Sequence, residues 1–223
     1  IDGPGGAGKS TVADNLAGKL RVPHLDTGAM YRAFGYQALQ EGLDASDAEA
    51  MEALAERTRI DVKFLDDGQH TYVDGRDVTG LIRTPEAGMA ASDCGTLGAV
   101  RKLMVALQQE IAGRQSMILD GRDIGTRVLP GATLKVFLTA APEVRARRRY
   151  EELKKRGEPV NYEGILEMIK ARDARDAGRA DAPMAAAPDA LLLDTTDLDI
   201  EAAFRAAVAI VEAAMARKSG PSA

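Results

Sequence analysis

With 223 residues, of which 45% are apolar, the chain can bury the core of one α/β domain with a small appended lobe. Its formal net charge of −5 argues against a nucleic-acid polymer as partner, and its apolar runs are too short to span a membrane. The one cysteine, Cys94, excludes an internal disulfide, and with only two histidines beside it no zinc cluster of the usual spacing can form. We therefore expect a single domain over residues 1–223, in the reducing cytoplasm.

The first predicted element is a phosphate-binding loop that follows Ile1-Asp2, the end of an expected strand. The loop fits the pattern G-x-x-x-x-G-K-[ST] at every fixed position, with the residues Gly3-Pro4-Gly5-Gly6-Ala7-Gly8-Lys9-Ser10. Such glycines let consecutive backbone N–H groups turn inward around phosphates, while Lys9 reaches the β- and γ-phosphates and Ser10 binds Mg²⁺. A glycine-rich turn that binds nothing is the alternative. We expect the loop to bind a nucleoside triphosphate.

Short apolar runs then alternate with helical patterns. The predicted strands are Val22–Leu25, Met117–Leu119, Leu134–Leu138 and Leu191–Leu193. The predicted helices are Thr11–Leu20, Gly28–Gln40, Ala48–Arg57, Ala99–Ala112, Glu143–Arg156, Tyr162–Asp176 and Ile200–Arg217, before a frayed tail at Ser219–Ala223. This alternation predicts an α/β fold in which a parallel sheet is covered by helices on both faces, with ligands at the carboxyl ends of the strands. Asp26-Thr27-Gly28 and Asp120–Asp123 each follow one of these strands directly.

One stretch breaks this alternation. Residues 60–65 partly alternate between apolar and polar, and two hairpin signals follow, at residues 66–68 and 74–75, before a last short run at residues 76–78. We expect a small antiparallel sheet inserted into the α/β domain. A long, partly ordered loop is the alternative.

The sequence lacks the motifs that are typical of two other classes of phosphate-loop protein. A guanine-specific switch reads its base with N-K-x-D, and neither Asn15 nor Asn161 begins that pattern. Motor and helicase ATPases usually place a glutamate directly after the second acidic strand, whereas Gly121 follows Asp120. The chain offers arginine instead.

Residues 145–179 contain eleven Lys or Arg against seven Asp or Glu. Two predicted helices in this range carry clustered arginines, and the loop Gly157-Glu158-Pro159 joins them. Planar guanidinium groups grip phosphate oxygens at two points and stay charged at any working pH. The pattern predicts a mobile lid over a transferring phosphoryl group. A solvated face supported by pairs such as Glu151–Lys155 is the alternative, above all for Arg145, Arg147 and the cluster Lys154–Arg156.

Three segments are similar, in order and spacing, to bacterial-type cytidylate kinase: Asp26-Thr-Gly-Ala-Met-Tyr-Arg32, Asp120-Gly-Arg-Asp-Ile-Gly-Thr126 and Arg172-Asp-Ala-Arg-Asp-x-x-Arg179. The resemblance runs from Ile1 to about residue 217, and adenylate kinase does not share these segments. It implies a P-loop kinase with a central parallel sheet flanked by helices. An antiparallel-sheet insert at about residues 60–95 would enlarge the monophosphate-binding lobe, and a helical lid would cover about residues 148–165. Thr27 replaces an expected serine, and Ser10 stands where some relatives have glycine.

The resemblance also implies roles for individual residues. ATP would be held by Gly3, Pro4, Gly5, Gly6, Ala7, Gly8, Lys9, Ser10 and Thr11, with Mg²⁺ on Ser10. The acceptor phosphate would be clamped by Arg32, Arg122 and Arg172, near Thr27 and with Tyr31 and Asp176 close to the ribose. The cytosine edge would be read by Ser92, Arg101, Asp123 and Arg179. The catalytic residues would be Lys9, Arg122 and Arg172 together with the lid residues Arg148 and Arg149.

Several of these residues also have a purely structural explanation. Ser92 lies in a small-residue stretch where close helix packing explains a serine equally well. Asp26 and Asp120 also fit ordinary caps where strands end. The alternative role of Asp123 is merely to orient Arg122, and the alternative for Tyr31 is a core tyrosine with its hydroxyl at the surface.

The activity implied by the resemblance is direct transfer of the γ-phosphoryl group of ATP to CMP or dCMP, with Mg²⁺, in pyrimidine nucleotide metabolism. The expected partners are small nucleotides, without a nucleic-acid polymer or membrane, and the family favours a monomer. Another small-molecule kinase of the same fold is the nearer alternative. A nucleotide-binding switch or regulatory ATPase is the more distant one.

Overall fold

The computed structural model describes residues 1–179 and 182–219, so all but Ser219 of the predicted frayed tail lies outside the described residues. The chain forms two compact units, each described by itself. We call the unit made of residues 1–20 and 121 onward the terminal unit, and Arg21–Asp120 the central unit. Among the described helices, none is long and apolar enough to cross a bilayer.

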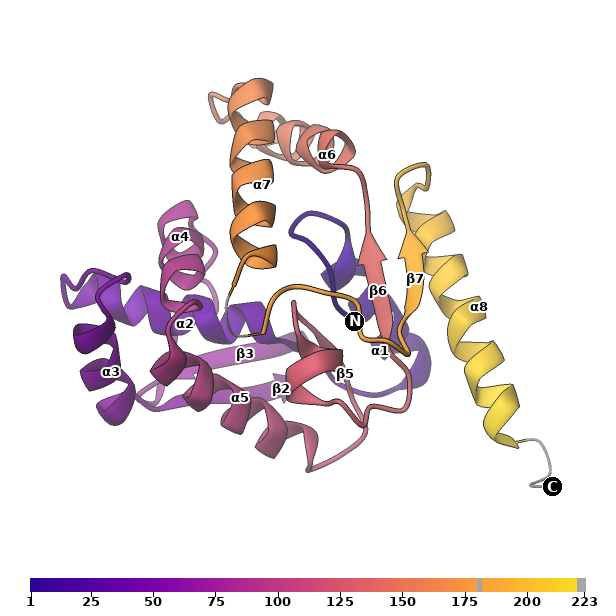
Figure 1. Cartoon of the computed structure of the whole chain (residues 1–223), viewed down its shortest axis with the longest axis horizontal. Coiled ribbons are helices and arrows are strands. Elements are labelled where there is room, and N and C mark those ends of the chain that lie inside the picture. Colours follow the sequence, from indigo (N-terminus) through magenta and orange to yellow (C-terminus); the bar gives the residue numbers. More distant parts are fainter. Residues whose placement is uncertain (180–181, 220–223) are drawn as a thin grey trace. The chain divides into compact units, whose positions relative to one another are not determined.

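Parallel pairing organises the sheet of the terminal unit. Strand β6 (Val136–Thr139) pairs in parallel with β7 (Leu191–Asp194), and Asp2 forms a parallel bridge to Phe137. The Asp2 N–H donates to Val136 O, and Leu138 N–H donates to Asp2 O, both at 2.8 Å. Helix α1 (Lys9–Leu20) packs against α8 (Ile200–Ser219), which runs beside β7 in Figure 1. The predicted parallel pairing is confirmed, and the loop of residues 3–8 leaves the strand position of Asp2 directly.

Two helices form a hairpin in the region expected to act as a lid. Helix α6 (Pro142–Lys155) and α7 (Tyr162–Ala177) pack on one another, and the connecting Gly157 has φ of 76°. The apolar contact centres on Ala146, Leu153 and Ile165. Because this small cluster is formed within the hairpin itself, the two helices are held together independently of the sheet.

A second parallel strand pair lies in the central unit. Strand β1 (His24–Asp26) pairs with β5 (Ile118–Asp120), and the register places Asp26 opposite Asp120. The carboxyl ends of the two strands therefore lie together, as predicted from the two motifs that follow them. After Asp120 the chain enters the terminal unit and forms η1 (Ile124–Val128), a short π-helical turn that we did not predict.

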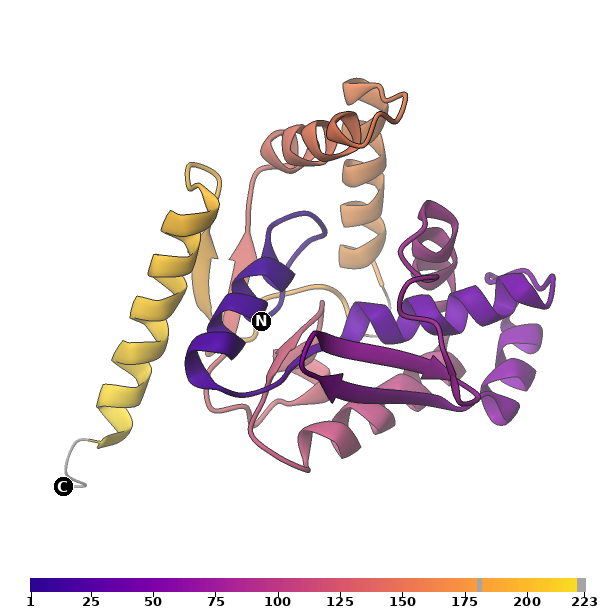
Figure 2. The same cartoon turned by 180° about the vertical axis from the view of Figure 1, so that it is seen from behind.

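Four α-helices complete the central unit: α2 (Thr27–Gln40), α3 (Ala48–Arg57), α4 (Pro85–Cys94) and α5 (Gly98–Ala112). Figure 2 shows α2 and α4 from behind, and α2 packs most extensively against α4. A Cβ on Gly35 would lie 2.8 Å from Ala91 N, so only glycine permits this close approach. We missed α4 as an element, although Thr84 caps it and Pro85 begins it. Its small residues hide the apolar periodicity.

The predicted insert is confirmed as an antiparallel sheet of three strands, β2 (Ile60–Leu65), β3 (Gly68–Val73) and β4 (Arg76–Asp77). Asp74 and Gly75 have φ of 48° and 82°, the left-handed values that a two-residue hairpin turn requires. The alternative of a partly ordered loop is thereby excluded.

One histidine joins two parts of this insert. His70 Nδ1 lies 2.7 Å from Asp77 Oδ2, and its Nε2 lies 2.9 Å from Asp67 Oδ1. Both carboxylates accept hydrogen bonds, so the arrangement is satisfied when both ring nitrogens carry protons. The hydrogen bonds that the His70 ring donates to Asp77 and Asp67 raise the pKa of His70 above 6.5. Hydrogen bonds from Thr79 and His70 lower the pKa of Asp77 to about 2.

We predict that His70→Gln lowers the melting temperature only within a limited pH window. The stabilisation from the raised pKa of His70 is fully present below pH 6.5 and is lost as pH rises through the raised value. The stabilisation from Asp77 is present above its ordinary pKa of 3.8 and is lost as pH falls through about 2. Melting curves of both proteins between pH 4 and 9 test this. A difference in melting temperature that is constant over that range would contradict the charged arrangement.

Candidate nucleotide site

The loop of residues 3–8 has a backbone that only glycine can adopt at its key positions. Gly3, Gly6 and Gly8 have φ of 139°, 76° and 98°. At Gly3 an added Cβ would lie only 1.9 Å from Leu138 O, so this glycine lets the loop leave the sheet in contact with β6. The sequence pattern predicted glycines for loop geometry, and these φ values are consistent with it.

Lys9 lies across this loop. Its side chain is buried, and its Nζ donates to Pro4 O at 2.9 Å. The ammonium group is thus held near the loop backbone, where phosphate oxygens would compete for it. Ser10 and Thr11 are exposed in the first turn of α1.

A Mg²⁺ ion fits this donor set. Mg²⁺ in nucleotide sites takes one or two protein oxygens and completes its shell with phosphate oxygens and water. The exposed Ser10 provides such an oxygen beside Lys9. Within residues 1–179 and 182–219, no cluster of three or more His, Cys, Asp or Glu side chains could hold a metal by itself.

Two guanidinium groups approach the loop at Gly5. A Cβ on Gly5 would lie 3.3 Å from Arg122 Nη2 and 3.7 Å from Arg172 Nη1. These residues are 50 positions apart in the sequence, and both were predicted to hold the acceptor phosphate. The structure brings them to the same residue of the loop, which concentrates positive charge at the place where a phosphate chain would lie.

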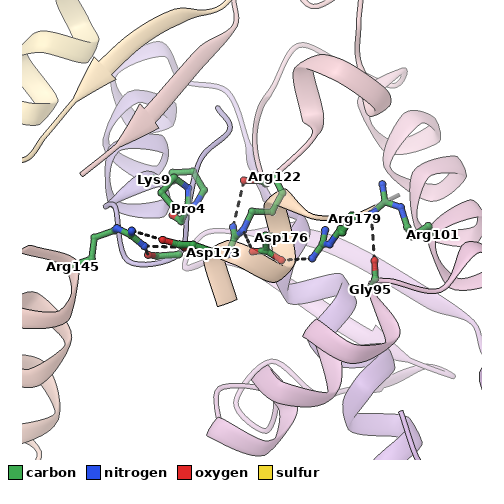
Figure 3. A network of polar contacts seen from close by, with 11 residues as sticks. Pro4, Lys9, Gly95, Arg101, Arg122, Arg145, Asp173, Asp176 and Arg179 are labelled. Atoms are coloured by element: carbon green, nitrogen blue, oxygen red, sulfur yellow. Dashed lines mark hydrogen bonds and ion pairs between the residues drawn. The ribbon is translucent and has the colours of Figure 1, made fainter. Parts of the chain in front are cut away.

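A buried carboxylate connects two of the predicted arginines. Asp176, which is 1% exposed, accepts from Arg122 Nε at 3.0 Å and also pairs with Arg179 (Figure 3). The Arg179 Nε is buried and lacks a hydrogen-bond partner in the described part of the chain. Asp176 therefore fixes the two guanidinium groups and offsets part of their repulsion.

Arg145 is a buried structural residue and not part of a solvated face. Its guanidinium donates to Ala140 O at 2.8 Å, to Gly5 O at 3.1 Å and to both oxygens of Asp173 (Figure 3). One side chain thereby joins the end of β6, the loop and α7. The alternative of a solvated face for Arg145 was wrong, because the periodicity of a helix does not reveal which distant segment covers it.

The two predicted lid arginines differ in their surroundings. Arg148 donates to Thr195 O at 2.7 Å and Leu198 O at 3.1 Å, with a longer contact to Ala7 O at 3.4 Å, and burial lowers its pKa. Arg149 is 40% exposed and pairs with Glu152 on its own helix. Arg148 is anchored to backbone carbonyls, whereas Arg149 lies at the surface.

Asp2 supports the segment that carries Arg122 and Asp123. Its buried carboxylate accepts from Ile124 N and Gly125 N, both at 2.7 Å. This pair of hydrogen bonds fixes the backbone directly after Asp123, which is itself buried. We did not identify Asp2 from the sequence. Its signal was a carboxylate within an otherwise apolar strand end, which is costly to bury unless it is hydrogen-bonded.

The predicted acceptor residues of the central unit lie at the carboxyl ends of β1 and β5. Thr27 Oγ1 donates to Asp120 O at 2.7 Å, and Arg32 Nη2 donates to Asp26 Oδ2 at 2.7 Å. Asp26 also caps α2 through Ala29 N at 3.0 Å. The cap predicted as an alternative role for Asp26 is therefore real, and the same carboxylate orients Arg32. Asp120 Oδ1 lies within hydrogen-bonding distance of His24 Nε2, at 3.1 Å.

Two further predicted residues of the central unit are buried and polar. The Ser92 hydroxyl has no hydrogen-bond partner among the described residues, and Arg101, 3% exposed, donates to Gly95 O at 3.5 Å (Figure 3). Buried hydroxyl groups without partners are uncommon in folded proteins. Simple helix packing accounts for the size of Ser92 but not for its unsatisfied hydroxyl, which suits a group that meets a ligand. Tyr31 lies against Gly95, with Cδ1 3.7 Å from the position of an added Cβ.

Together these features define a P-loop kinase: a lysine-bearing glycine loop leaves a parallel sheet, and arginines paired with carboxylates meet the loop. The family model described as cytidylate kinase matches residues 1–213. Curated proteins named cytidylate kinase from Caldicellulosiruptor bescii and Bacillus subtilis are each 48% identical over 201 residues. These matches cover 90% of this chain and 89% and 90% of the relatives. A curated protein of the same name from Solibacter usitatus is 47% identical over 95% of this chain and 90% of the relative's length. The chain belongs to the cytidylate kinase family.

We predict that alanine substitutions of the two lid arginines have different effects. Arg148→Ala removes hydrogen bonds from a charged donor, each worth about 1.5–3 kcal/mol, and lowers the melting temperature by several degrees. Arg149→Ala leaves the melting temperature unchanged but, if Arg149 closes over ATP, lowers kcat. Calorimetry and steady-state kinetics on both variants test this. An unchanged melting temperature for Arg148→Ala, or unchanged kinetics for Arg149→Ala, would contradict the respective role.

Proposed function

We propose that the protein transfers the γ-phosphoryl group of ATP to CMP or dCMP by direct in-line displacement, giving ADP and the nucleoside diphosphate. Family membership supports the reaction. The observation that carries the mechanism is the approach of Arg122 and Arg172 to the loop at Gly5. It supports a site in which positive charge surrounds a phosphoryl group during its transfer.

On the donor side, residues 3–11 hold the ATP phosphates, with Lys9 as the positive charge nearest the β- and γ-phosphates. Mg²⁺ on Ser10, when bound, neutralises charge on the phosphate oxygens. In this proposal Lys9 gives up its contact with Pro4 O when the triphosphate arrives. The lysine side chain already lies against the loop, so little reorganisation is needed.

On the acceptor side, the nucleophile is already a phosphate anion, so the residues must align it and neutralise charge without a strong general base. We assign this to Arg32, Arg122 and Arg172. Asp26 and Asp176 hold two of these arginines in place. The arginines are therefore oriented before the acceptor binds, which lowers the entropic cost of alignment.

We assign recognition of cytosine to Ser92, Arg101, Asp123 and Arg179, and the ribose surroundings to Tyr31, Asp176 and Thr27. An ionised Asp123 offers only acceptors, which suits the amino group at C4, and the arginines offer only donors, which suits N3 and O2. Uracil would place a carbonyl against the carboxylate and an N–H against a guanidinium. The unsatisfied Ser92 hydroxyl supports this assignment.

The remaining proposals concern the whole protein. We propose that residues 1–223 act as one kinase domain, that the insert at about residues 60–95 belongs to the monophosphate-binding lobe, and that the lid spans about residues 148–165. We further propose that the protein works as a monomer in the cytoplasm without a membrane or nucleic-acid partner. Sedimentation at micromolar concentration with and without CMP tests the monomer.

We predict that Lys9→Ala lowers kcat by about 10²–10³-fold, because the lysine neutralises charge on the group being transferred. The fold should persist, because the hydrogen bond from Lys9 Nζ to Pro4 O lies within the loop itself. Lys19→Ala is the matched control: this lysine lies in the last turn of the same helix and pairs at the surface with Glu212. Release of ADP measured with saturating CMP tests both. Near-normal turnover in folded Lys9→Ala would contradict the loop's role.

We predict a preference for CMP and dCMP over UMP of roughly 10²–10³ in kcat/KM, below the 10⁴–10⁵ of rigid hydrogen-bonding sites because water softens the mismatch. The double substitution Ser92→Ala and Asp123→Ala should reduce this preference, mainly because it weakens the binding of CMP. ADP release with CMP, dCMP, UMP, AMP or water as acceptor tests this. Equal use of CMP and UMP would contradict the base assignment. Hydrolysis independent of acceptor would favour a switch or regulatory ATPase.

A further inference from the structure

A side chain of the antiparallel insert grips the backbone at the end of β1. Gln69 Oε1 accepts from Asp26 N at 2.7 Å, and Gln69 Nε2 donates to Asp26 O at 3.2 Å. The side-chain amide therefore pairs with both backbone groups of one residue, 43 positions away in the sequence. A primary amide can both accept and donate in this way without a change of protonation.

Asp26 is the residue that orients Arg32. One oxygen of its carboxylate accepts from Ala29 N at 3.0 Å and caps α2, and the other accepts from Arg32 Nη2 at 2.7 Å. The space is limited: a Cβ on Gly28 would lie 3.0 Å from both Arg32 Nη1 and Asp26 Oδ1. The Asp26 carboxylate thus links the position of the Asp26 backbone to that of the Arg32 guanidinium group.

Gln69 is itself held by the insert. Its Nε2 also lies 3.2 Å from Thr71 Oγ1, and Thr71 is 1% exposed. Thr71 N in turn donates to Thr79 Oγ1 at 2.9 Å, and Val78 N donates to Thr71 O at 2.9 Å. These contacts leave Gln69 with a fixed geometry against β1, so the amide acts as a spacer between the insert and Asp26.

We propose that Gln69 is a positioning residue that sets Arg32 for the phosphate of the acceptor nucleotide. The inference rests on the proposed function, in which Arg32 clamps that phosphate. The insert thereby contributes to acceptor binding through Asp26, without Gln69 contacting the nucleotide itself. Gln69 acts on binding of the monophosphate and leaves binding of ATP at the loop unaffected.

The first test compares Gln69→Ala with His70→Ala. His70 is the next residue on β3, but its described hydrogen bonds remain within the insert, to Asp67 and Asp77. We expect Gln69→Ala to raise KM for CMP about 5–20-fold, equivalent to about 1–2 kcal/mol for the lost hydrogen bonds, with KM for ATP unchanged. His70→Ala should lower the melting temperature without this change. Unchanged KM for CMP in Gln69→Ala, or an equal rise in both variants, overturns the proposal.

The second test uses Gln69→Glu, which keeps the size of the side chain. An ionised glutamate cannot donate to Asp26 O, and it adds negative charge beside the Asp26 carboxylate. A protonated glutamate can both accept and donate. The ratio of KM for CMP between this variant and the unaltered protein, taken at each pH to cancel titration of the nucleotide, should fall as pH decreases toward the glutamate pKa. A ratio that does not change with pH overturns the hydrogen-bonding account.

The third test is a double-mutant cycle on CMP binding, measured by calorimetry with Gln69→Ala, Arg32→Ala and the double variant. If Gln69 acts through Arg32, its substitution has no further effect once Arg32 is alanine. Additive effects overturn that route. If the unaltered protein does not phosphorylate CMP, the proposed function fails. If it does while Gln69→Ala binds CMP normally, only the positioning role fails.

Discussion

Mutual repulsion among guanidinium groups is the constraint on which the terminal unit depends. Arg122, Arg145, Arg172 and Arg179 all belong to this unit, and the first three reach the loop at Gly5. Without bound phosphate such a cluster destabilises the folded state unless carboxylates offset it. Asp173 and Asp176, three residues apart on α7, supply that compensation for three of the four arginines. Helix α7 therefore carries both signs of charge on one face, and this pattern sets where each arginine lies.

The central unit satisfies a related requirement through neutral and paired groups. Arg32 is fixed by Asp26, and Asp26 is fixed by the amide of Gln69. The Ser92 hydroxyl is left unsatisfied at a buried position, which costs free energy unless a ligand supplies the partner. The two units thus differ in the polar groups that they orient. The terminal unit holds several oriented arginines, whereas the central unit holds Arg32 and the buried Arg101 together with the unsatisfied hydroxyl group of Ser92.

Local patterns predicted most of the elements because their causes are local. The glycine loop, the helix over residues 48–57 and the Asp74-Gly75 turn each follow from backbone preferences of a few neighbouring residues. Helix α4 escaped because its small residues carry little apolar periodicity. The supporting contacts of the site could not be predicted: Asp2 with Ile124, Arg145 with Asp173 and Gln69 with Asp26 join distant segments. Their partners become neighbours only through the tertiary fold.

The contact of Gly3 with Leu138 O has a consequence for how this sequence can diverge. Every single-base change that replaces this glycine by another residue adds a Cβ, and that atom has no room beside the carbonyl oxygen. A compensating replacement of the Leu138 side chain cannot help, because the obstacle is backbone. We therefore expect glycine to remain at position 3 even where neighbouring residues are substituted.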